Sequence, residues 1–468
     1  MRYRSTRDQT PQLDFEHAML DALARDGGLF VPETWPSLEP GLLREAGTLP
    51  FAALSAEVMR PFVGGCVTPE NLRQITDAAY RRFRHAATTP LLQLDTNLWL
   101  LELYHGPTLA FKDVAMQVLG GLFDHLLARR GERLTIIGAT SGDTGSAAIE
   151  AIRGRSQARI VILHPHGRTS EVQRRQMTTV DAPNVHNVAI EGSFDDCQAL
   201  VKAMFNDAGF REQQRLSGVN SINWARVMPQ IVYYVAAAAA LGGSVERPVS
   251  FSVPTGNFGN VYAGYAATRM GLPVRRLLVA SNDNDILTRT LNHGDHSLRD
   301  TLATTSPSMD IQVSSNFERL LFELYGRDGA AVRSLMHQLQ DRRSFELPEA
   351  ARGAAARTFS AYRADEARVA DTMRRVYRQD GLLIDPHTAV GVTAAWDHAQ
   401  AVPGDAAVPT VVLGTAHPAK FPDAVEAATG VRPPLPDFLA DLYDRPERFT
   451  VLANDLQTVQ DHIRGLPA

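Results

Sequence analysis

The chain has 468 residues, which is too long for one compact core and predicts about three structural units. Hydrophobic residues make up 44% and charged residues 21%, as in ordinary globular proteins rather than disordered or fibrous ones. The net charge of −5 provides no basic field for a nucleic acid or an anionic membrane, and the longest apolar run, 231–241, is well short of the roughly 20 residues that a bilayer requires. We therefore expect neither nucleic acid nor membrane as a partner, and a packed helix over 231–241.

Cysteine and lysine usage narrow the chemistry further. Cys66 and Cys197 are far apart and outside any CxxC pattern, which indicates a reducing compartment without a disulfide framework. The charged start, residues 1–7, has no apolar run of a secretory signal, so we expect a cytoplasmic protein. Of 47 basic residues only three are lysines, Lys112, Lys202 and Lys420. Any amine nucleophile must be one of these, because guanidinium stays protonated.

The element pattern changes once along the chain. The first ninety or so residues are mostly helical, including a helix over 15–25 that Gly27 and Gly28 end. From about Pro90, short β-rich runs alternate with helices, which predicts an α/β fold with parallel sheets covered on both faces. The expected strands are 134–138, 160–163, 185–190, 249–253, 276–280 and 410–413, and the expected helices include 146–153, 193–204 with a Ser193–Asp196 capping box, and one ending at 270. A charged region, 283–380, reads as helical elaboration.

Three loops follow predicted strands at the edge where such sheets bind ligands. Residues 138–145 (GATSGDTG) precede a helix and form an anion site, although a plain glycine-rich turn with a Ser/Thr cap fits equally well; the P-loop lysine and GxGxxG are missing. Residues 254–260 (PTGNFGN) allow close backbone approach and suit a phosphate. Residues 414–421 offer Thr415, His417 and Lys420.

Residues 105–113 (HGPTLAFKD) contain one of the three lysines. Lys112 falls near the start of a predicted helix that runs to Leu127, where an amine can have a lowered pKa and act as a Schiff-base nucleophile. A solvated surface lysine is the alternative, but the scarcity of lysine and the neighbouring anion loops favour a functional amine. His164, His166 and His387 lack the companions of a metal site, so no metal is expected.

Together these motifs resemble the threonine synthase family, pyridoxal 5′-phosphate-dependent lyases of the tryptophan-synthase-β-like fold, fold type II. The resemblance covers nearly the whole chain. Residues 3–7 and 26–32 are similar to the family's N-terminal segment, 105–113 to its cofactor-lysine motif, 140–145 to its substrate loop and 254–260 to its cofactor-phosphate loop. Residues 314–319 and 415–421 are similar to signatures of the longer subfamily of bacteria and fungi.

The resemblance implies a role for each matching residue. Lys112 would be the catalytic residue and bind the cofactor as a Schiff base, with Phe111 beside it. The implied cofactor contacts are Asp143 near the pyridine 3′-oxygen, Thr415 on the pyridine nitrogen, and Gly256, Asn257, Phe258, Gly259 and Asn260 around the phosphate. The implied substrate contacts are Thr140, Ser141 and Thr144 for the α-carboxylate, and Asn220, Ser221, Arg226 and Asn257 for the substrate phosphate.

Two of these implied contacts have chemical consequences. Many relatives have asparagine at the position of Asp143, and a carboxylate there would repel a phenolate oxygen. A hydroxyl such as that of Thr415 does not force the pyridine nitrogen to stay protonated, so the ring is a milder electron sink and favours β- and γ-chemistry over transamination. For Arg226, an ordinary salt bridge to a surface carboxylate is the alternative to phosphate binding.

The resemblance implies conversion of O-phospho-L-homoserine and water to L-threonine and phosphate by a monomer. The alternatives are another fold-type-II lyase, such as a threonine or serine dehydratase or an amino-phosphate phospholyase, and a cofactor-free binding protein on the same fold. We expect an N-terminal segment over 1–88, a catalytic region of two α/β lobes over 89–430 and a helical tail over 431–468.

Overall fold

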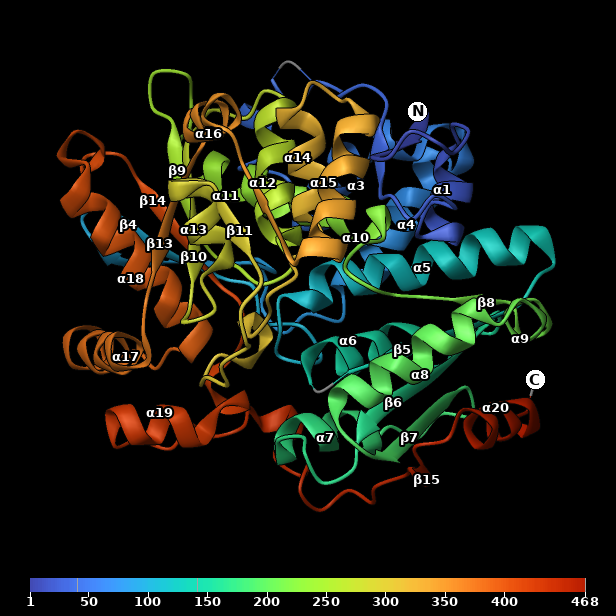
Figure 1. The fold of residues 1–468 in the computed structure, drawn as a ribbon. Coiled ribbons are helices and arrows are strands. Elements are labelled where there is room, and N and C mark those ends of the chain that lie inside the picture. Colours follow the sequence, from blue (N-terminus) through green and yellow to red (C-terminus); the bar gives the residue numbers. More distant parts are fainter. Residues whose placement is uncertain (40, 141, 468) are drawn as a thin grey trace.

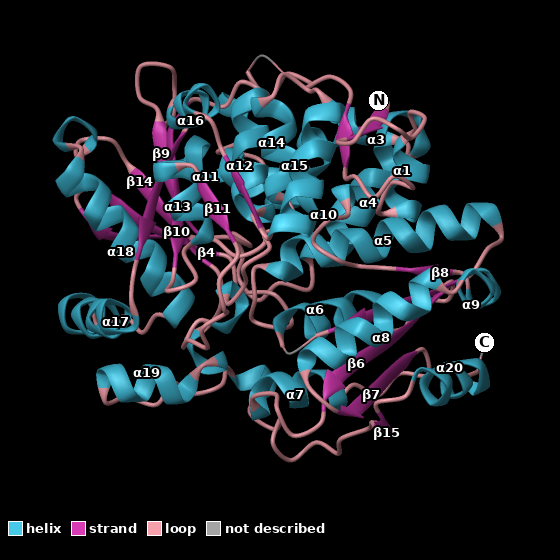
Figure 2. Cartoon of the chain, in the orientation of Figure 1, coloured by secondary structure: helices cyan, strands magenta, loops and turns pink. Residues whose placement is uncertain are grey.

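Two β-sheets with helices on both faces organise the chain in the computed structural model, which describes residues 1–39, 41–140 and 142–467 (Figures 1 and 2). They form a large and a small lobe, as the predicted α/β class requires. The strands of the large lobe are, in spatial order, β13 (Phe359–Arg363), β10 (Val274–Ser281), β9 (Val249–Pro254), β14 (Thr410–Gly414), β4 (Leu98–Glu102) and β3 (Leu91–Asp95). Those of the small lobe are β15 (Thr450–Ala453), β7 (Val185–Glu191), β6 (Ala158–Pro165), β5 (Leu134–Ala139) and β8 (Leu216–Ser217).

Neighbouring strands are parallel throughout both sheets except for β3, which runs antiparallel to β4. Successive side chains of a strand point to opposite sides, and the central strands β9 and β14 and the second half of β10 are buried on both faces, whereas the edge strand β3 is largely exposed. In β10, Leu277 and Val279 enter the main core, whereas Leu278 and Ala280 face the layer of α17 (Glu366–Asp380) and α18 (Pro386–Ala401). The six strands expected from the sequence are all present.

Helices surround and connect the two lobes. The N-terminal part contributes β1 (Tyr3–Ser5), α1 (Phe15–Asp21), β2 (Phe30–Pro32), α2 (Leu42–Glu45), α3 (Phe51–Val63) and α4 (Pro69–Tyr80). The small lobe carries α6 (Asp143–Ile152), α7 (Glu171–Thr178), α8 (Phe194–Asn206), α9 (Ala208–Gln214) and α20 (Leu456–Gly465). The large lobe carries α10 (Trp224–Val227), α11 (Ile231–Ala240), α12 (Gly259–Arg269), α13 (Ile286–His293), β11 (Asp295–Ser297), α14 (Phe317–Leu324), α15 (Gly329–Arg342), β12 (Ser344–Glu346), α16 (Glu349–Ala356) and α19 (Pro422–Thr429).

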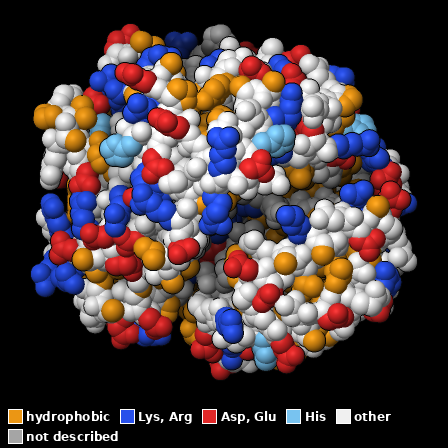
Figure 3. Space-filling model, in the orientation of Figure 1, with side chains coloured by type: hydrophobic (Ala, Val, Ile, Leu, Met, Phe, Trp, Pro, Cys, Tyr) orange, Lys and Arg blue, Asp and Glu red, His pale blue; other side chains and the backbone are white. Residues whose placement is uncertain are grey.

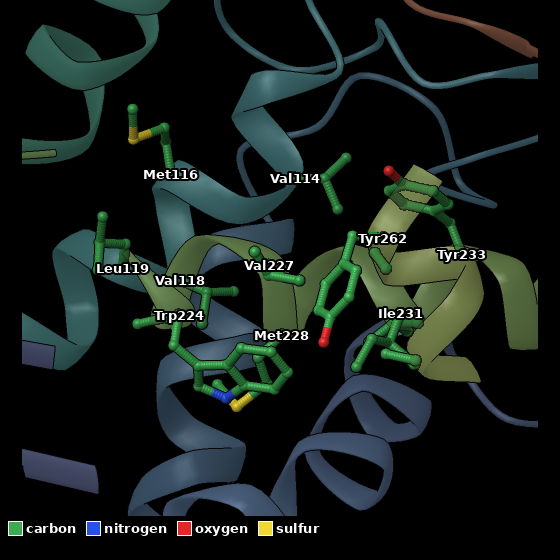
Figure 4. Close-up of a cluster of buried hydrophobic side chains, with 14 of the residues drawn as sticks. Val114, Met116, Val118, Leu119, Trp224, Val227, Met228, Ile231, Tyr233 and Tyr262 are labelled. Atoms are coloured by element: carbon green, nitrogen blue, oxygen red, sulfur yellow. The ribbon is translucent and has the colours of Figure 1, made fainter. Parts of the chain in front are cut away.

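Helix α5 (Lys112–Arg130) leads from β4 in the large lobe to β5 in the small lobe and lies in the main core. Figure 4 shows Val118 of this helix close to Trp224 and to Met228, which follows α10. Trp224 is fully buried and its ring packs 5.6 Å from that of Phe62. This packing fixes the start of α5 relative to the segment that carries Arg226.

Three expectations about local structure were wrong. The region 283–380 is not only helical elaboration, because it contains the β11–β12 pair and also β13, which pairs with β10 at the edge of the large sheet. The first helix ends at Asp21 rather than at Arg25, because Ala22 adopts a positive φ of 58° and the chain turns there. Residues 431–468 are not simply a helical tail, because the strand β15 precedes α20 and pairs in parallel with β7. The run Thr450–Ala453 is too short to show a strand period, and it completes the small sheet. By contrast, the capping box of Ser193 and Asp196 is present as predicted.

Close helix packing gives a first prediction. A Cβ on Gly120 of α5 would lie 2.3 Å from the carbonyl oxygen of Ala151 in α6, so backbone would have to move. We expect Gly120→Ala to lower the free energy of unfolding by about 1–3 kcal/mol in urea denaturation. The control is Gly353→Ala in α16, where a Cβ meets no atom within 4 Å, and which should be stabilising by up to about 1 kcal/mol. Equal effects of the two changes would contradict this account of the α5–α6 contact.

In the part of the chain that the structure describes, no helix combines the length and apolar character needed to cross a bilayer.

Candidate active site

Loops from both lobes meet at the carboxyl ends of the strands, and the surface is hollowed between the lobes there (Figures 1 and 3). The segment before Lys112 and the loop after β14 are joined directly. The Phe111 N–H donates to the carbonyl of Thr415 at 2.8 Å, and the His417 N–H donates to the carbonyl of Leu109 at 3.0 Å. Two motifs that are far apart in sequence therefore form one wall of the site.

Lys112 is the first residue of α5, and its side chain is 11% exposed. Its Nζ lies 3.6 Å from Oδ2 of Asp143 and 5.8 Å from the ring centre of Phe111. Burial lowers the pKa of Lys112 to about 8; Asp143 opposes this shift, whereas the positive charges of Lys420 and Arg226 add to it. A buried amine with this pKa has a reactive uncharged fraction at neutral pH, as Schiff-base chemistry requires.

Asp143, the first residue of α6, is held by three groups. Its Oδ1 accepts hydrogen bonds from Lys420 Nζ at 2.8 Å and from Gln173 Nε2 at 2.9 Å, and its Oδ2 faces Lys112. Burial alone would raise the pKa of Asp143, but the ammonium groups of Lys420 and Lys112 and these hydrogen bonds hold it well below its usual range. The carboxylate is therefore charged, and the two ammonium groups compensate its charge. This compensation reduces the repulsion that a bare carboxylate would exert on a phenolate oxygen at this position.

The glycine loop, residues 254–260, connects β9 to α12 and is held from behind. Ser314 Oγ donates to the carbonyl of Gly256 at 2.7 Å, and Asn316 Nδ2 donates to the carbonyl of Asn257 at 2.9 Å. A Cβ on Gly256 would lie 2.5 Å from the carbonyl oxygen of Ser308, so this position excludes any larger side chain. The SSNFER signature, 314–319, thus positions the loop.

The loop ends at the amino terminus of α12, where backbone N–H groups have no intrahelical partner. Phe258 is the N-cap residue with a φ of 60°, a strained conformation for a non-glycine residue. Gly259 and Asn260 begin the helix, and the Asn260 side-chain oxygen accepts from the Tyr234 hydroxyl at 2.9 Å. A helix terminus preceded by a glycine loop is a suitable site for a phosphate.

Arg226 is buried, with 4% of its surface exposed. Its Nη1 donates to the carbonyl of Val219 at 2.8 Å, whereas its Nε is buried without a partner. Within residues 1–39, 41–140 and 142–467, no carboxylate forms an ion pair with this guanidinium. The alternative of an ordinary surface salt bridge is therefore wrong for Arg226 in this structure. Burial lowers the pKa of Arg226 to about 10, and an anion is the natural partner for such a group.

Thr415 follows β14 directly and is 5% exposed. Its Oγ1 has no hydrogen-bond partner among the described residues, although its backbone N–H donates to Thr388 Oγ1 at 3.3 Å. Asp385 in turn accepts from the backbone N–H of Thr388 at 3.1 Å. The backbone of Thr415 is thus held in place, and its buried hydroxyl is left with unused hydrogen-bonding capacity.

The other predicted substrate residues differ in their surroundings. Thr140 Oγ1 accepts the N–H groups of Gly142 and Gly145, both at 3.1 Å, so this hydroxyl shapes its own loop. Thr144 and Ser221 are half-buried, and Asn220 and Asn257 are exposed. The expectation for Ser141 lies outside the described residues.

Sequence reasoning missed several residues of this region. Lys420 and Gln173 bind Asp143, and neither was assigned a contact with it. His387 was set aside as an unsupported metal ligand, but its Nε2 accepts from the Ser308 N–H at 3.1 Å, while its Nδ1 lies 2.7 Å from Asp385. It therefore supports the carbonyl that packs on Gly256. The motif 414–421 could have marked Lys420 as a residue of the site. No sequence pattern shows that Lys420 and Gln173 contact Asp143 or that His387 contacts Ser308.

The residues present fit a phosphorylated pyridine aldehyde. Lys112 supplies a buried amine, the unpartnered hydroxyl of Thr415 is a partner for a ring nitrogen, and the glycine loop provides the phosphate site. The hydrogen bond from Phe111 to Thr415 brings the first two of these groups together. Among the described residues, no cluster of three or more His, Cys, Asp or Glu side chains could hold a metal ion.

Comparison with known proteins agrees with this site. The family model "Pyridoxal-phosphate dependent enzyme" matches residues 83–414, so fold and site define a pyridoxal-phosphate-dependent enzyme of fold type II. The models "Threonine synthase N terminus" and "Threonine synthase, C-terminal" match residues 2–80 and 388–463. The chain is 53% identical to threonine synthase from Pseudomonas aeruginosa, with all of both chains covered. It belongs to the threonine synthase family.

Two solved structures show the same fold over almost the entire chain. Pyridoxal-phosphate-bound threonine synthase from Brucella melitensis superposes with a TM-score of 0.96 at 53% identity, covering 99% of both chains. Threonine synthase from yeast gives a TM-score of 0.94 at 37% identity, covering 99% of this chain and 98% of the other. The chain is thus a pyridoxal-phosphate-dependent lyase, as its sequence motifs predicted.

Proposed function

We propose that this enzyme converts O-phospho-L-homoserine and water to L-threonine and inorganic phosphate. The observation that carries the substrate assignment is Arg226, a buried guanidinium that no described carboxylate neutralises and whose charge acts on Lys112. A planar guanidinium matches two oxygens of a phosphate, and Asn220 and Ser221 precede it in the same segment. A substrate with both an amino-acid end and a phosphate fits the amine and the guanidinium together.

Each residue then has a defined task. Pyridoxal phosphate, when bound, supplies an electron sink for the carbon from which a proton is lost. Lys112 would hold the cofactor at rest. With the substrate bound, its free Nζ would accept the α-proton, release it, and then accept a β-proton, and the two protons would return to Cγ and Cα before threonine leaves. Thr140, Ser141 and Thr144 bind the α-carboxylate. Arg226, Asn220, Ser221 and Asn257 hold the phosphate that departs from Cγ, and water then adds at Cβ.

We propose the same cofactor contacts that the sequence resemblance implies. Gly256, Asn257, Phe258, Gly259 and Asn260 would hold the cofactor phosphate at the start of α12, and Phe111 would lie beside the lysine. Asp143 would lie near the 3′-oxygen, with Lys420 compensating its charge. The open hydroxyl of Thr415 supports a bond to the ring nitrogen.

We also propose an organisation and a location. The family models over 2–80 and 83–414 support an N-terminal segment over 1–88 and a catalytic region that begins near 89. The catalytic region would extend to 430 and be followed by a C-terminal tail over 431–468. Both cysteines are free, which suits the cytoplasm. We expect a monomer, which light scattering of the purified protein tests.

One experiment separates this proposal from its alternatives. The purified enzyme should show a near-visible absorption band that borohydride bleaches, and it should release phosphate and threonine from O-phospho-L-homoserine in equal amounts. A dehydratase would keep the band but form a 2-oxo acid and ammonia instead. A colourless protein that pyridoxal phosphate does not restore would point to a binding protein on the same fold.

Replacement of the Thr415 hydroxyl should change the products. In Thr415→Asp a carboxylate would keep a bound pyridine nitrogen protonated, deepen the electron sink and favour proton return at the wrong atom. We expect retained cofactor absorption, slower threonine formation and a larger share of side products, measured by chromatography. Thr415→Ser, which keeps the hydroxyl, is the control. An unchanged product ratio in Thr415→Asp would refute this role.

A further inference from the structure

Lys420 is a fully buried lysine to which the proposed reaction assigns no contact with substrate or cofactor. It ends the short 3-10 turn Pro418–Lys420 after β14, and its side chain is 0% exposed. Its Nζ donates to Asp143 Oδ1 at 2.8 Å and to the carbonyl of Thr108 at 2.7 Å. Thr108 belongs to the segment just before Lys112. The ammonium group therefore joins the large lobe, the lysine segment and the first residue of α6 in the small lobe.

A fully buried lysine requires an anionic partner, because burying an unpaired ammonium group costs free energy. The pair with Asp143 meets this requirement, but it also fixes a charge next to the reactive amine. The charged groups that act on Lys112 are Asp143 from α6, Lys420 from the turn after β14, and Arg226 from α10. Asp143 attracts the protonated amine, and the two cations repel it.

We propose that Lys420 is a positioning residue that neutralises the Asp143 carboxylate, so that this carboxylate orients Lys112 without holding it in the protonated state. The proposal rests on the proposed role of Lys112 as the reactive amine. With Lys420 present, the Asp143 carboxylate interacts with two cations and with Gln173. The charge of Lys420 partly cancels that of the carboxylate, which weakens the attraction between Asp143 and Lys112. Without Lys420, Asp143 would have Lys112 as its one remaining cationic neighbour within 4 Å among the described residues.

The signs of the expected changes follow from these charges. Lys420→Met removes a repelling cation and frees the carboxylate, so the pKa of Lys112 should rise from about 8 by about one unit. The reactive fraction of the amine at pH 7 should then fall about tenfold. Asp143→Asn removes the attraction and leaves both cations, so the pKa of Lys112 should fall. In the double variant the two changes should largely cancel, and Lys420→Arg should resemble the wild type because it keeps the charge.

The small number of lysines makes this measurable. The full chain, freed of cofactor with a competing amine, is labelled with limiting isotopic acetic anhydride at pH 6–10, and each lysine is quantified by peptide mass spectrometry. Lys202 in α8 is exposed and serves as the reference within every sample. The pH midpoint of Lys112 labelling gives its pKa. The rate at which pyridoxal phosphate restores the near-visible band, followed over the same pH range, provides a second readout, because condensation requires the free amine.

The matched control is Lys202→Met, which also removes one lysine charge, and in which the Lys112 midpoint should not move. Opposite shifts in Lys420→Met and Asp143→Asn, with cancellation in the double variant, support the proposal. A Lys112 midpoint that stays at the wild-type value in Lys420→Met overturns it, and so does an equal rise in Lys420→Arg, because both results mean that the charge of Lys420 is not the cause.

The same experiment distinguishes failure of this proposal from failure of the proposed function. If the midpoints shift as expected but borohydride does not attach the cofactor to Lys112, the charge coupling stands and the role of Lys112 is wrong. If the cofactor attaches to Lys112 and the midpoints do not shift, the role of Lys112 stands and that of Lys420 is wrong.

Discussion

Lys112→Ala should lower threonine formation at least about a thousandfold and remove the borohydride-sensitive absorption. The reason is that one amine both carries the cofactor and moves the protons. Lys202 is exposed on α8, and Lys420 is fixed between Asp143 and Thr108, so neither can take its place. Lys112→Arg should be no better, because guanidinium neither forms an imine nor accepts a proton at neutral pH. Phosphate release from O-phospho-L-homoserine is the measurement.

The fold should survive this substitution. Burial lowers the pKa of Lys112 to about 8, so the unfolded chain binds more protons between that value and the ordinary pKa near 10.5. The cost of burying this amine is therefore largest below about pH 8 and disappears as the pH rises toward 10.5. At pH 7 the cofactor-free Lys112→Ala chain should be at least as stable as the wild type in urea. A variant that kept a sizeable part of the activity would refute the Schiff-base role, and Lys202→Ala is the fully active control.

Arg226→Ala should lower kcat/KM for O-phospho-L-homoserine by about tenfold or more for each strong bond lost. Charge-assisted hydrogen bonds of this kind contribute about 1.5–3 kcal/mol each, and 1.4 kcal/mol corresponds to a factor of ten. The departing phosphate gains charge as its bond to Cγ breaks, so part of the loss should appear in kcat. Steady-state kinetics of phosphate release measure both parameters.

The decisive control for Arg226 is a substrate without phosphate. Slow activity on serine and the cofactor absorption should be nearly unchanged in Arg226→Ala, because neither requires a phosphate partner. Arg374→Ala, which removes an exposed arginine 3.1 Å from Asp371, should change neither activity, since surface ion pairs contribute about 0–1 kcal/mol. Equal losses on both substrates in Arg226→Ala would assign this residue to the fold or to cofactor binding.

Features with a local cause could be predicted from the sequence. The start of α5 at Lys112, the capping box of Ser193 and the strand–glycine–helix order around Gly256 each depend on neighbouring residues, and the structure has all three. The α/β class followed from the alternation of strands and helices. The family resemblance then placed distant motifs in one site, and the hydrogen bond from Phe111 to Thr415 joins two of them.

Features that depend on distant partners could not be predicted. Lys420 and Thr108 are 312 residues apart, and no local pattern shows that they meet. The free guanidinium of Arg226 was equally hidden, because a sequence does not show whether a carboxylate lies nearby. The strand β15 has four residues, three of them exposed and one half-buried, and pairing with β7 rather than periodicity makes it a strand.

The origin of β15 has a consequence for biosynthesis. This strand comes from residues 450–453, whereas its neighbour β7 and the next strand, β6, are translated far earlier. During translation, this edge of β7 stays unpaired until almost the entire polypeptide has been synthesised and β15 has left the ribosome. An exposed strand edge is a template for pairing with other chains, so the nascent protein passes through a long period of susceptibility to aggregation. Premature termination before Thr450 should therefore produce insoluble fragments rather than slightly shortened enzymes.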